Sequence, residues 1–203
     1  MIALRRLLRS ERAASAAEFA LVLPLLLILL FGIIDVGRFL WQFNQAEKAT
    51  QMGVRYAVVT NPIPSGLSSY SFSITGGIAQ GSPVPTANFT DATCNNSSCA
   101  CVATAGNFCS SVGYDATAFA NLVARMKMMY PTLTANNVQV EYRNVGLGFA
   151  GDPNGPDVSP LVTVKVQNLT FRPLTCLVFA CSISMPDFRA ALTLEDASGS
   201  VSN

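Results

Sequence analysis

The chain contains no histidine among its 203 residues. The absence of imidazole excludes Ser/His/Asp and Cys/His catalytic arrangements and every zinc site that depends on histidine. The sequence also offers no defensible pair of converging carboxylates and no phosphate-binding loop. We therefore expect no enzyme, no cofactor and no metal centre.

Charged residues are scarce as well. They make up 12% of the chain, about half the usual share for a soluble globular protein, and 13 basic against 12 acidic residues leave a formal charge of +1. Because no basic footprint exists outside the first residues, a nucleic-acid partner is not expected. Part of the deficit reflects an apolar run, and part reflects a surface rich in Ser, Thr, Asn and Gly, as is common outside the cytoplasm.

The most prominent feature present is the charge-free run Phe19–Ile34, sixteen residues bracketed by Glu18 and Asp35. As a helix it would be about 24 Å long, somewhat less than the roughly 30 Å hydrocarbon core of a bilayer. The helix is long enough to cross a bilayer when Ala16, Ala17, Val36 and the aliphatic part of Arg38 are counted, with some thinning of the bilayer or snorkelling at the ends. Four arginines in Met1–Arg12 place the amino terminus on the cytoplasmic side and the remainder in the periplasm.

Two general interpretations of this segment are available. A secretory signal peptide would require a small-x-small cleavage site after the apolar run, but Gly32–Arg38 does not provide one. A plain membrane anchor explains the run but leaves the cost of Glu18 unexplained, because an ionisable group at the edge of a span is expensive unless it is paired or interfacial.

A third interpretation comes from a family resemblance. The order Glu18–Pro24 (EFALVLP), an aliphatic block and then Asp35–Arg38 (DVGR) resembles the amino-terminal signature of TadE-like proteins, over about 26 residues from Ala13. These are pseudopilin-like components of the tight-adherence (Tad, or Flp) pilus assembly apparatus of bacteria. The resemblance implies a minor pseudopilin or assembly component. Its expected partners are the inner membrane, other pilin-like subunits, Tad assembly proteins and a prepilin peptidase.

The resemblance also implies a type III signal that is cut five residues before a glutamate. Carried onto this chain, the cut falls between Ala13 and Ala14, and Glu18 becomes the fifth residue of the mature protein. The family usually has glycine before the cut, whereas this chain has Ala13. Cleavage would create an amino group that can pair with the Glu18 carboxylate of the same or a neighbouring subunit.

The helix is expected to continue beyond the membrane to about Val59, because small and apolar residues recur every three or four positions until the stop signal Asn61–Gly66. We predict a leader over residues 1–13, a transmembrane helix with its periplasmic extension over 14–60, a periplasmic domain over 61–195 and a flexible tail over 196–203. The chain would then be a single-pass protein of the bacterial inner membrane.

The remaining sequence predicts an α+β domain with a pilin-like outline. An amphipathic helix is predicted over Tyr114–Tyr130, and about three or four antiparallel strands are predicted at Tyr70–Thr75, Val138–Tyr142, Leu161–Val166 and Phe188–Glu195. The Gly-rich stretch Gly146–Asp157 is interpreted as a long hairpin connection, with weak calcium binding through Asp152 and Asp157 left open.

An even number of cysteines on the exported side favours disulfide bonds over a redox or zinc site. The six are Cys94, Cys99, Cys101, Cys109, Cys176 and Cys181. They allow fifteen pairings, and proximity favours Cys176 with Cys181 and two bridges among the first four. The apolar segment Phe171–Met185 around the last pair is either a partner-contact patch or part of the core, and the sequence leaves both open.

A function of another class also remains open. In it, the chain is a membrane-tethered periplasmic binding module, for a ligand such as a surface polymer, and the apolar helix is an uncleaved anchor. The two hypotheses differ at the leader, because only the pseudopilin is expected to lose residues 1–13.

Overall fold

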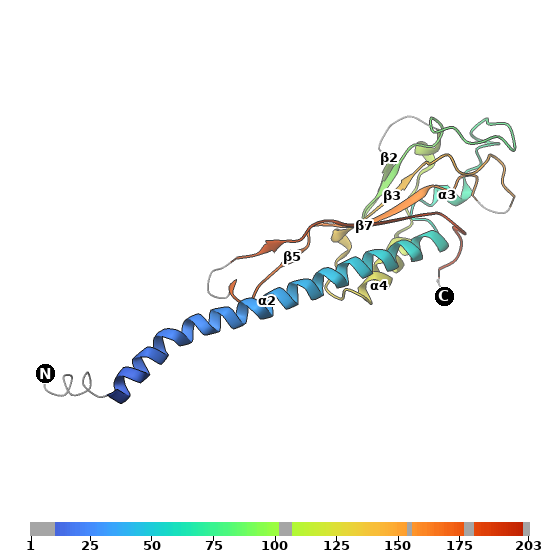
Figure 1. Cartoon of the computed structure of the whole chain (residues 1–203). Coiled ribbons are helices and arrows are strands. Elements are labelled where there is room, and N and C mark those ends of the chain that lie inside the picture. Colours follow the sequence, from blue (N-terminus) through green and yellow to red (C-terminus); the bar gives the residue numbers. More distant parts are fainter. Residues whose placement is uncertain (1–10, 102–106, 154–155, 177–180, 201–203) are drawn as a thin grey trace. The chain divides into compact units, whose positions relative to one another are not determined.

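The computed structural model describes residues 11–101, 107–153, 156–176 and 181–200 (Figure 1). It divides into two compact units. The stem unit comprises Met1–Gln42 and Thr170–Ile183, and the head unit comprises Phe43–Leu169 and Ser184–Asn203.

The first described element is the long helix α2 (Glu11–Val59), which supplies most of the stem unit and enters the head unit at Phe43. Leucine and alanine favour this conformation, and α2 continues through Pro24. It ends at Val59, just before Asn61 and Pro62, so the predicted stop is confirmed. Two short strands, β5 (Thr170–Phe171) and β6 (Ile183–Ser184), pair with each other near the end of the chain.

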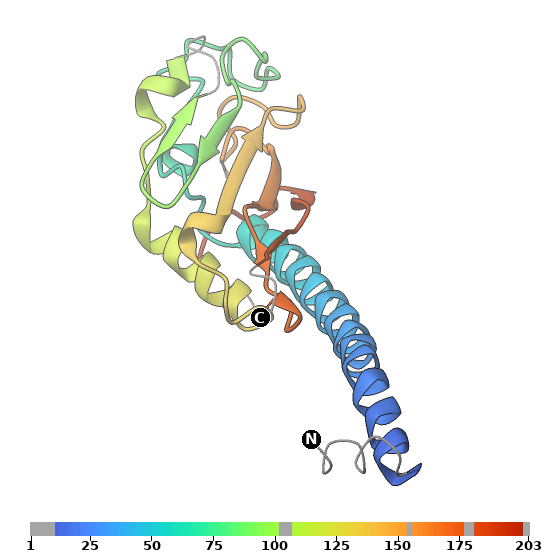
Figure 2. The ribbon, with the colours of Figure 1, turned by 90° about the vertical axis from the view of Figure 1, so that its left-hand side faces the viewer.

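The head unit is built on one antiparallel sheet of five strands. They are β1 (Ala92–Cys94), β2 (Cys99–Cys101), β3 (Val138–Arg143), β4 (Leu161–Val166) and β7 (Phe188–Thr193), in the order β2-β1-β3-β4-β7 (Figure 2). In the register, Val140 faces Val164, which faces Ala190. The α+β prediction is confirmed, as are the strands at β3, β4 and β7 and the hairpin connection between β3 and β4.

Two details of the predicted sheet were wrong. Residues 71–76 form turns instead of a strand, with the N–H groups of Thr75 and Gly76 both donating to the Ser71 carbonyl. Tyr70 and Phe72 are buried in a cluster of aromatic rings with Phe89 and Phe108, so their alternation does not mark a sheet face. The missing strands are β1 and β2, whose three residues each are too short for a periodic signal.

Four helical elements are described in the head unit. They are α3 (Gly66–Ser69), the 3-10 turns η1 (Asn107–Ser111) and η2 (Ala135–Asn137), and α4 (Ala116–Lys127). The Asp115 carboxylate caps α4 by accepting from the N–H groups of Thr117 (2.8 Å) and Ala118 (3.0 Å). Its apolar face is buried, as predicted, through Phe119, Leu122, Val123 and Met126.

The core of the head unit joins the last turns of α2 to α4 and to the sheet. A Cβ at Gly53 would lie 2.8 Å from the Met126 sulfur, so the glycine permits the close approach of α2 and α4 (Figure 1). Phe43 of α2 meets Phe188 of β7 edge-on at 4.8 Å. Tyr142 is fully buried, and its hydroxyl oxygen accepts the Ile63 N–H at 3.1 Å. Burial raises the pKa of Tyr142 well above its ordinary value.

The cysteines lie at disulfide distance in three pairs. Cys94–Cys99 closes the β1–β2 hairpin, Cys101–Cys109 joins β2 to η1, and Cys176–Cys181 lies in the stem unit. The pairing agrees with the one favoured by proximity. Disulfides of this kind stabilise mainly by restricting the unfolded chain.

Candidate functional site

The apolar part of α2 has its side chains on the outside of the stem unit. Every large apolar side chain between Phe19 and Ile34 is at least 36% exposed, and Leu21 reaches 75%. Within the described residues, α2 is the one helix long and apolar enough to cross a membrane. These features fit a single-pass membrane protein, because lipid tails would cover the exposed apolar surface.

The three residues of the predicted processing signal all lie in α2. The side chain of Glu18 is exposed, whereas the side chains of Ala13 and Ala14 lie outside the described ones. The distance of Glu18 from the predicted cut is therefore fixed by helical geometry. Cleavage between Ala13 and Ala14 stays a prediction.

Asp35 has the opposite environment and is only 6% exposed, although the neighbouring Ile34 and Val36 are largely exposed. Its carboxylate accepts the N–H groups of Leu174 at 2.7 Å and Thr175 at 2.9 Å. The Thr175 hydroxyl and the Arg38 guanidinium also donate to it, at 3.0 and 3.1 Å. Four donors thus satisfy one buried carboxylate, as a buried charge requires.

The segment that supplies these donors comprises the described residues 170–176 and 181–183, which we call the strap. Its Phe171 ring is 1% exposed. That ring meets Phe39 edge-on at 5.4 Å, and the Arg38 guanidinium carbon lies 5.4 Å from its centroid. The Cys176–Cys181 bond closes the strap on itself. Asp35, Arg38 and Phe39 therefore form the place on α2 where the strap is attached.

The strap has some side chains in the core and others exposed, so it is not entirely core, and partner contact stays a prediction. Phe171 and Pro173 are buried, whereas Leu174 and Ile183 are 37% and 47% exposed. Sequence reasoning used Asp35 as the end of the apolar run and as part of the family motif, but it did not predict that the carboxylate is buried and bound by the strap. Asp35, like Glu18, is an ionisable residue that borders the apolar run and needs partners, and this is the sequence signal that could have identified it.

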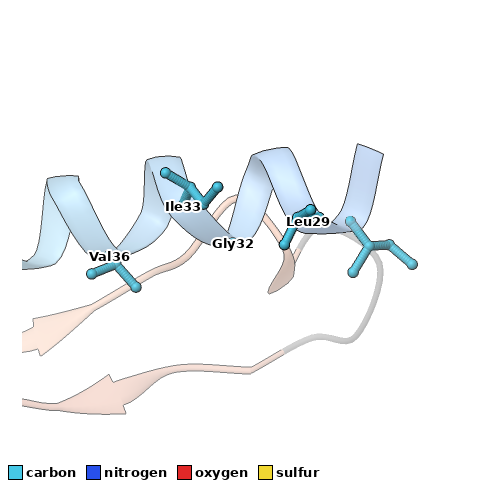
Figure 3. Close-up of a pocket in the computed structure, with 5 residues that line it drawn as sticks. Leu29, Gly32, Ile33 and Val36 are labelled. Atoms are coloured by element: carbon cyan, nitrogen blue, oxygen red, sulfur yellow. The ribbon is translucent and has the colours of Figure 1, made fainter. Parts of the chain in front are cut away.

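A shallow apolar groove of about 540 Å³ lies on α2, lined by Ile28, Leu29, Gly32, Ile33 and Val36. Figure 3 shows Gly32 between the side chains of Leu29 and Val36. Apart from Gly32 itself, its two chain neighbours and the adjacent backbone of α2, no described atom lies within 4 Å of where a Cβ on Gly32 would be. The groove therefore exists because this position of α2 has no side chain.

The acidic residues of the Gly146–Asp157 loop act within the fold. The Asp157 carboxylate accepts the N–H groups of Phe72 (2.6 Å) and Asp152 (3.1 Å), which ties the loop to the residues after α3. Among the described side chains no group of three or more potential metal ligands occurs. The Asp157 carboxylate thus holds the loop within the fold, and calcium binding through Asp152 and Asp157 stays an untested prediction.

Comparison with known proteins bears on the amino-terminal part of the chain. Neither a curated protein nor a solved structure was found to match the chain. A family model described as TadE-like protein matches residues 13–55, which include Glu18, Asp35 and Arg38. Such a segment indicates a component related to the Tad pilus. The resemblance predicted from the sequence motif is confirmed over this range: residues 13–55 are a TadE-like segment.

Proposed function

We propose that the chain is a minor pseudopilin or assembly component of a Tad/Flp-type pilus or a related secretion system. The observation that carries this proposal is the TadE-like match over residues 13–55, on a helix whose apolar side chains are exposed. In this function the amino terminus is cytoplasmic, α2 crosses the inner membrane once, and residues 61–195 are periplasmic.

The mechanism is insertion of α2 among the stems of other pilin-like subunits. Between helices in lipid, association depends on close packing, because the hydrophobic effect gains little there. The groove at Gly32 suits such packing, since a neighbouring helix can approach the α2 backbone where no side chain intervenes. We assign this groove to the apolar stem helix of a neighbouring pilin-like subunit.

Glu18 contributes to the same step. Removal of residues 1–13 by a prepilin peptidase leaves the new amino group of Ala14 four residues before Glu18. An opposite charge lowers the cost of placing a carboxylate in a low-dielectric interface. The pairing lets Glu18 enter the stem bundle, within one subunit or between two.

The direct test is the state of the amino terminus. The full-length chain is expressed with an active or an inactivated prepilin peptidase, extracted from membranes, and analysed by intact mass and amino-terminal sequencing. We expect an amino terminus at Ala14 with the active peptidase only. Ala13→Leu should block the cut, because a large side chain does not fit a subsite for glycine, and Ala13→Gly is the matched control that keeps it.

Retention of residues 1–13 under all conditions would favour the membrane-tethered binding module. A second measurement separates the two functions in a piliated bacterium that carries this gene. Loss of pili on deleting the gene, with restoration by the wild-type chain, supports the pseudopilin. Unchanged piliation contradicts it.

A further inference from the structure

The strap is attached to α2 at a defined depth. Asp35 is the first charged residue after the run Phe19–Ile34, and Arg38 and Trp41 follow about 4.5 and 9 Å further along the helix axis. The headgroup layer on one side of a bilayer is roughly 5–8 Å thick. When the charge-free run occupies the hydrocarbon core, the turns from Asp35 to Trp41 therefore cross the headgroup layer.

The strap must lie at the same depth, because its contacts fix it to these turns. Leu174 and Thr175 bind the Asp35 carboxylate, and Phe171 packs on Phe39. The hydrogen bonds also satisfy Asp35, whose charge would otherwise be costly at the edge of the hydrocarbon.

The side chains exposed at this level have mixed character. Trp41, the single tryptophan of the chain, is 67% exposed, and Leu174 and Ile183 are 37% and 47% exposed. Arg172 is exposed and belongs to neither of the two ion pairs among the described residues. The sequence ranges 35–42 and 170–183 contain three charged residues, Asp35, Arg38 and Arg172. Because the positive charge of Arg38 balances the negative charge of Asp35, the two ranges together carry one net positive charge.

We infer that the strap and the adjoining turns of α2 form a binding surface for phospholipid headgroups. Arg172 binds lipid phosphate, and Trp41 and Leu174 lie at the boundary between headgroups and acyl chains. Tryptophan and basic residues favour such interfaces, and each basic residue near an anionic membrane surface contributes about 1 kcal/mol. The inference rests on the membrane span of the proposed function and adds a second attachment beside it.

The single tryptophan allows a depth measurement. The full-length chain is reconstituted into vesicles of phosphatidylethanolamine and phosphatidylglycerol that contain lipids brominated at a shallow or a deep acyl position. Trp41 should be quenched more by the shallow bromine. The double variant Trp41→Phe/Leu174→Trp moves the reporter onto the strap, and its tryptophan should show the same preference. A tryptophan at position 174 that no brominated lipid quenches overturns the inference.

Retention of the chain in vesicles after alkaline carbonate washing separates the inference from the span. If the chain is retained and position 174 is unquenched, the span stands and the headgroup surface does not. If the chain is washed out, both the span and the inference fail. Quenching at position 174 that disappears as the protein-to-lipid ratio rises would mean that a second copy displaces lipid from the strap, and quenching at low ratio still supports lipid binding.

The charge contribution is tested in the same double variant. Raising the phosphatidylglycerol fraction should increase shallow quenching at position 174. Adding Arg172→Gln should weaken the apparent phosphatidylglycerol affinity about fivefold, as expected for one basic residue. Arg189→Gln, which removes an exposed arginine of the head unit, is the matched control and should leave the affinity unchanged. Equal effects of the two substitutions would overturn the assignment of phosphate to Arg172.

Discussion

The two units of this chain are built with opposite polarity. In the stem unit the large apolar side chains of Phe19–Ile34 are exposed and a carboxylate, Asp35, is buried. In the head unit the aromatic side chains of Phe89, Phe108 and Tyr142 are fully buried. The difference fits a single-pass membrane protein, in which lipid tails cover the exposed apolar side chains of the stem unit.

The forces that hold each unit together differ accordingly. Burial of apolar surface stabilises the head unit by about 25 cal/mol per Å² removed from water. Lipid offers no such gain for the apolar run, so the strap depends on hydrogen bonds to Asp35 and on the rings of Phe39 and Phe171. Selective damage to each kind of contact should therefore affect one unit and spare the other.

The largest effect is expected from Tyr142→Ala in the head unit. Removing a fully buried aromatic side chain should lower the free energy of unfolding by about 3–5 kcal/mol, because of the cavity left behind. Denaturant unfolding of the full chain in detergent, followed by circular dichroism, measures the loss. Trp41 belongs to the stem unit, so its emission should not change. A shift of Trp41 emission together with the head transition would contradict the separation of the units.

Asp35→Ala should act locally on the stem unit. The N–H groups of Leu174 and Thr175 lose their acceptor, and hydrogen exchange at these two amides should approach that of an unstructured chain. Asp35→Asn keeps one acceptor oxygen and should retain part of the protection. Head amides, such as those of β3 and β4, serve as the internal control. Unchanged exchange in the strap would show that Phe171 packing alone holds it.

Tyr142→Phe is a milder change to the head core. It leaves the Ile63 N–H without its acceptor and should cost about 1–3 kcal/mol. Because burial raises the pKa of Tyr142, folding favours the protonated phenol. This contribution is fully present below the ordinary tyrosine pKa of about 10 and is lost as the pH rises beyond it. Stability of the wild type should therefore fall more steeply above pH ~10 than that of Tyr142→Phe, and parallel curves would contradict this.

Gly32→Leu should have the smallest effect on the isolated chain, because space is open where the side chain would lie. Its effect should appear only in assembly, where the leucine fills the groove assigned to a neighbouring stem. Gly37→Leu is the control, since Gly37 is also open but does not line the groove. Piliation reduced by Gly32→Leu and retained by Gly37→Leu is expected. Equal piliation of the two variants would remove the groove from the mechanism.

Features with strong local signals could be predicted from the sequence. The amphipathic pattern over Tyr114–Tyr130 identified α4, and the stop signal that begins at Asn61 marked the end of α2. The β1–β2 hairpin could not be predicted in the same way, because it depends on pairing of Ala92–Cys94 with Tyr142–Val140 of the distant strand β3. Tyr70 and Phe72 show the converse error, since alternation without a pairing partner produced turns.

The candidate site likewise has one part that could be predicted from the sequence and one part that could not. The motif from Glu18 to Arg38 is local, and it was sufficient to predict the TadE-like match. The attachment of the strap to Asp35 is not local, because 139 residues separate the carboxylate from the Leu174 N–H. No periodicity or spacing connects two positions so far apart. Only the three-dimensional arrangement assigns Asp35 its partners.

The separation of Asp35 and Leu174 in the sequence also determines when the hydrogen bonds of Asp35 can form during protein synthesis. At about 5–20 residues per second, the ribosome adds Leu174 roughly 7–28 s after Asp35. During this interval the carboxylate has only Arg38, three residues away, among the donors it finally binds. A chain truncated before the strap would keep its apolar run and its motif but never complete the coordination of Asp35. Completion of the stem unit therefore requires that the chain has been translated as far as the strap.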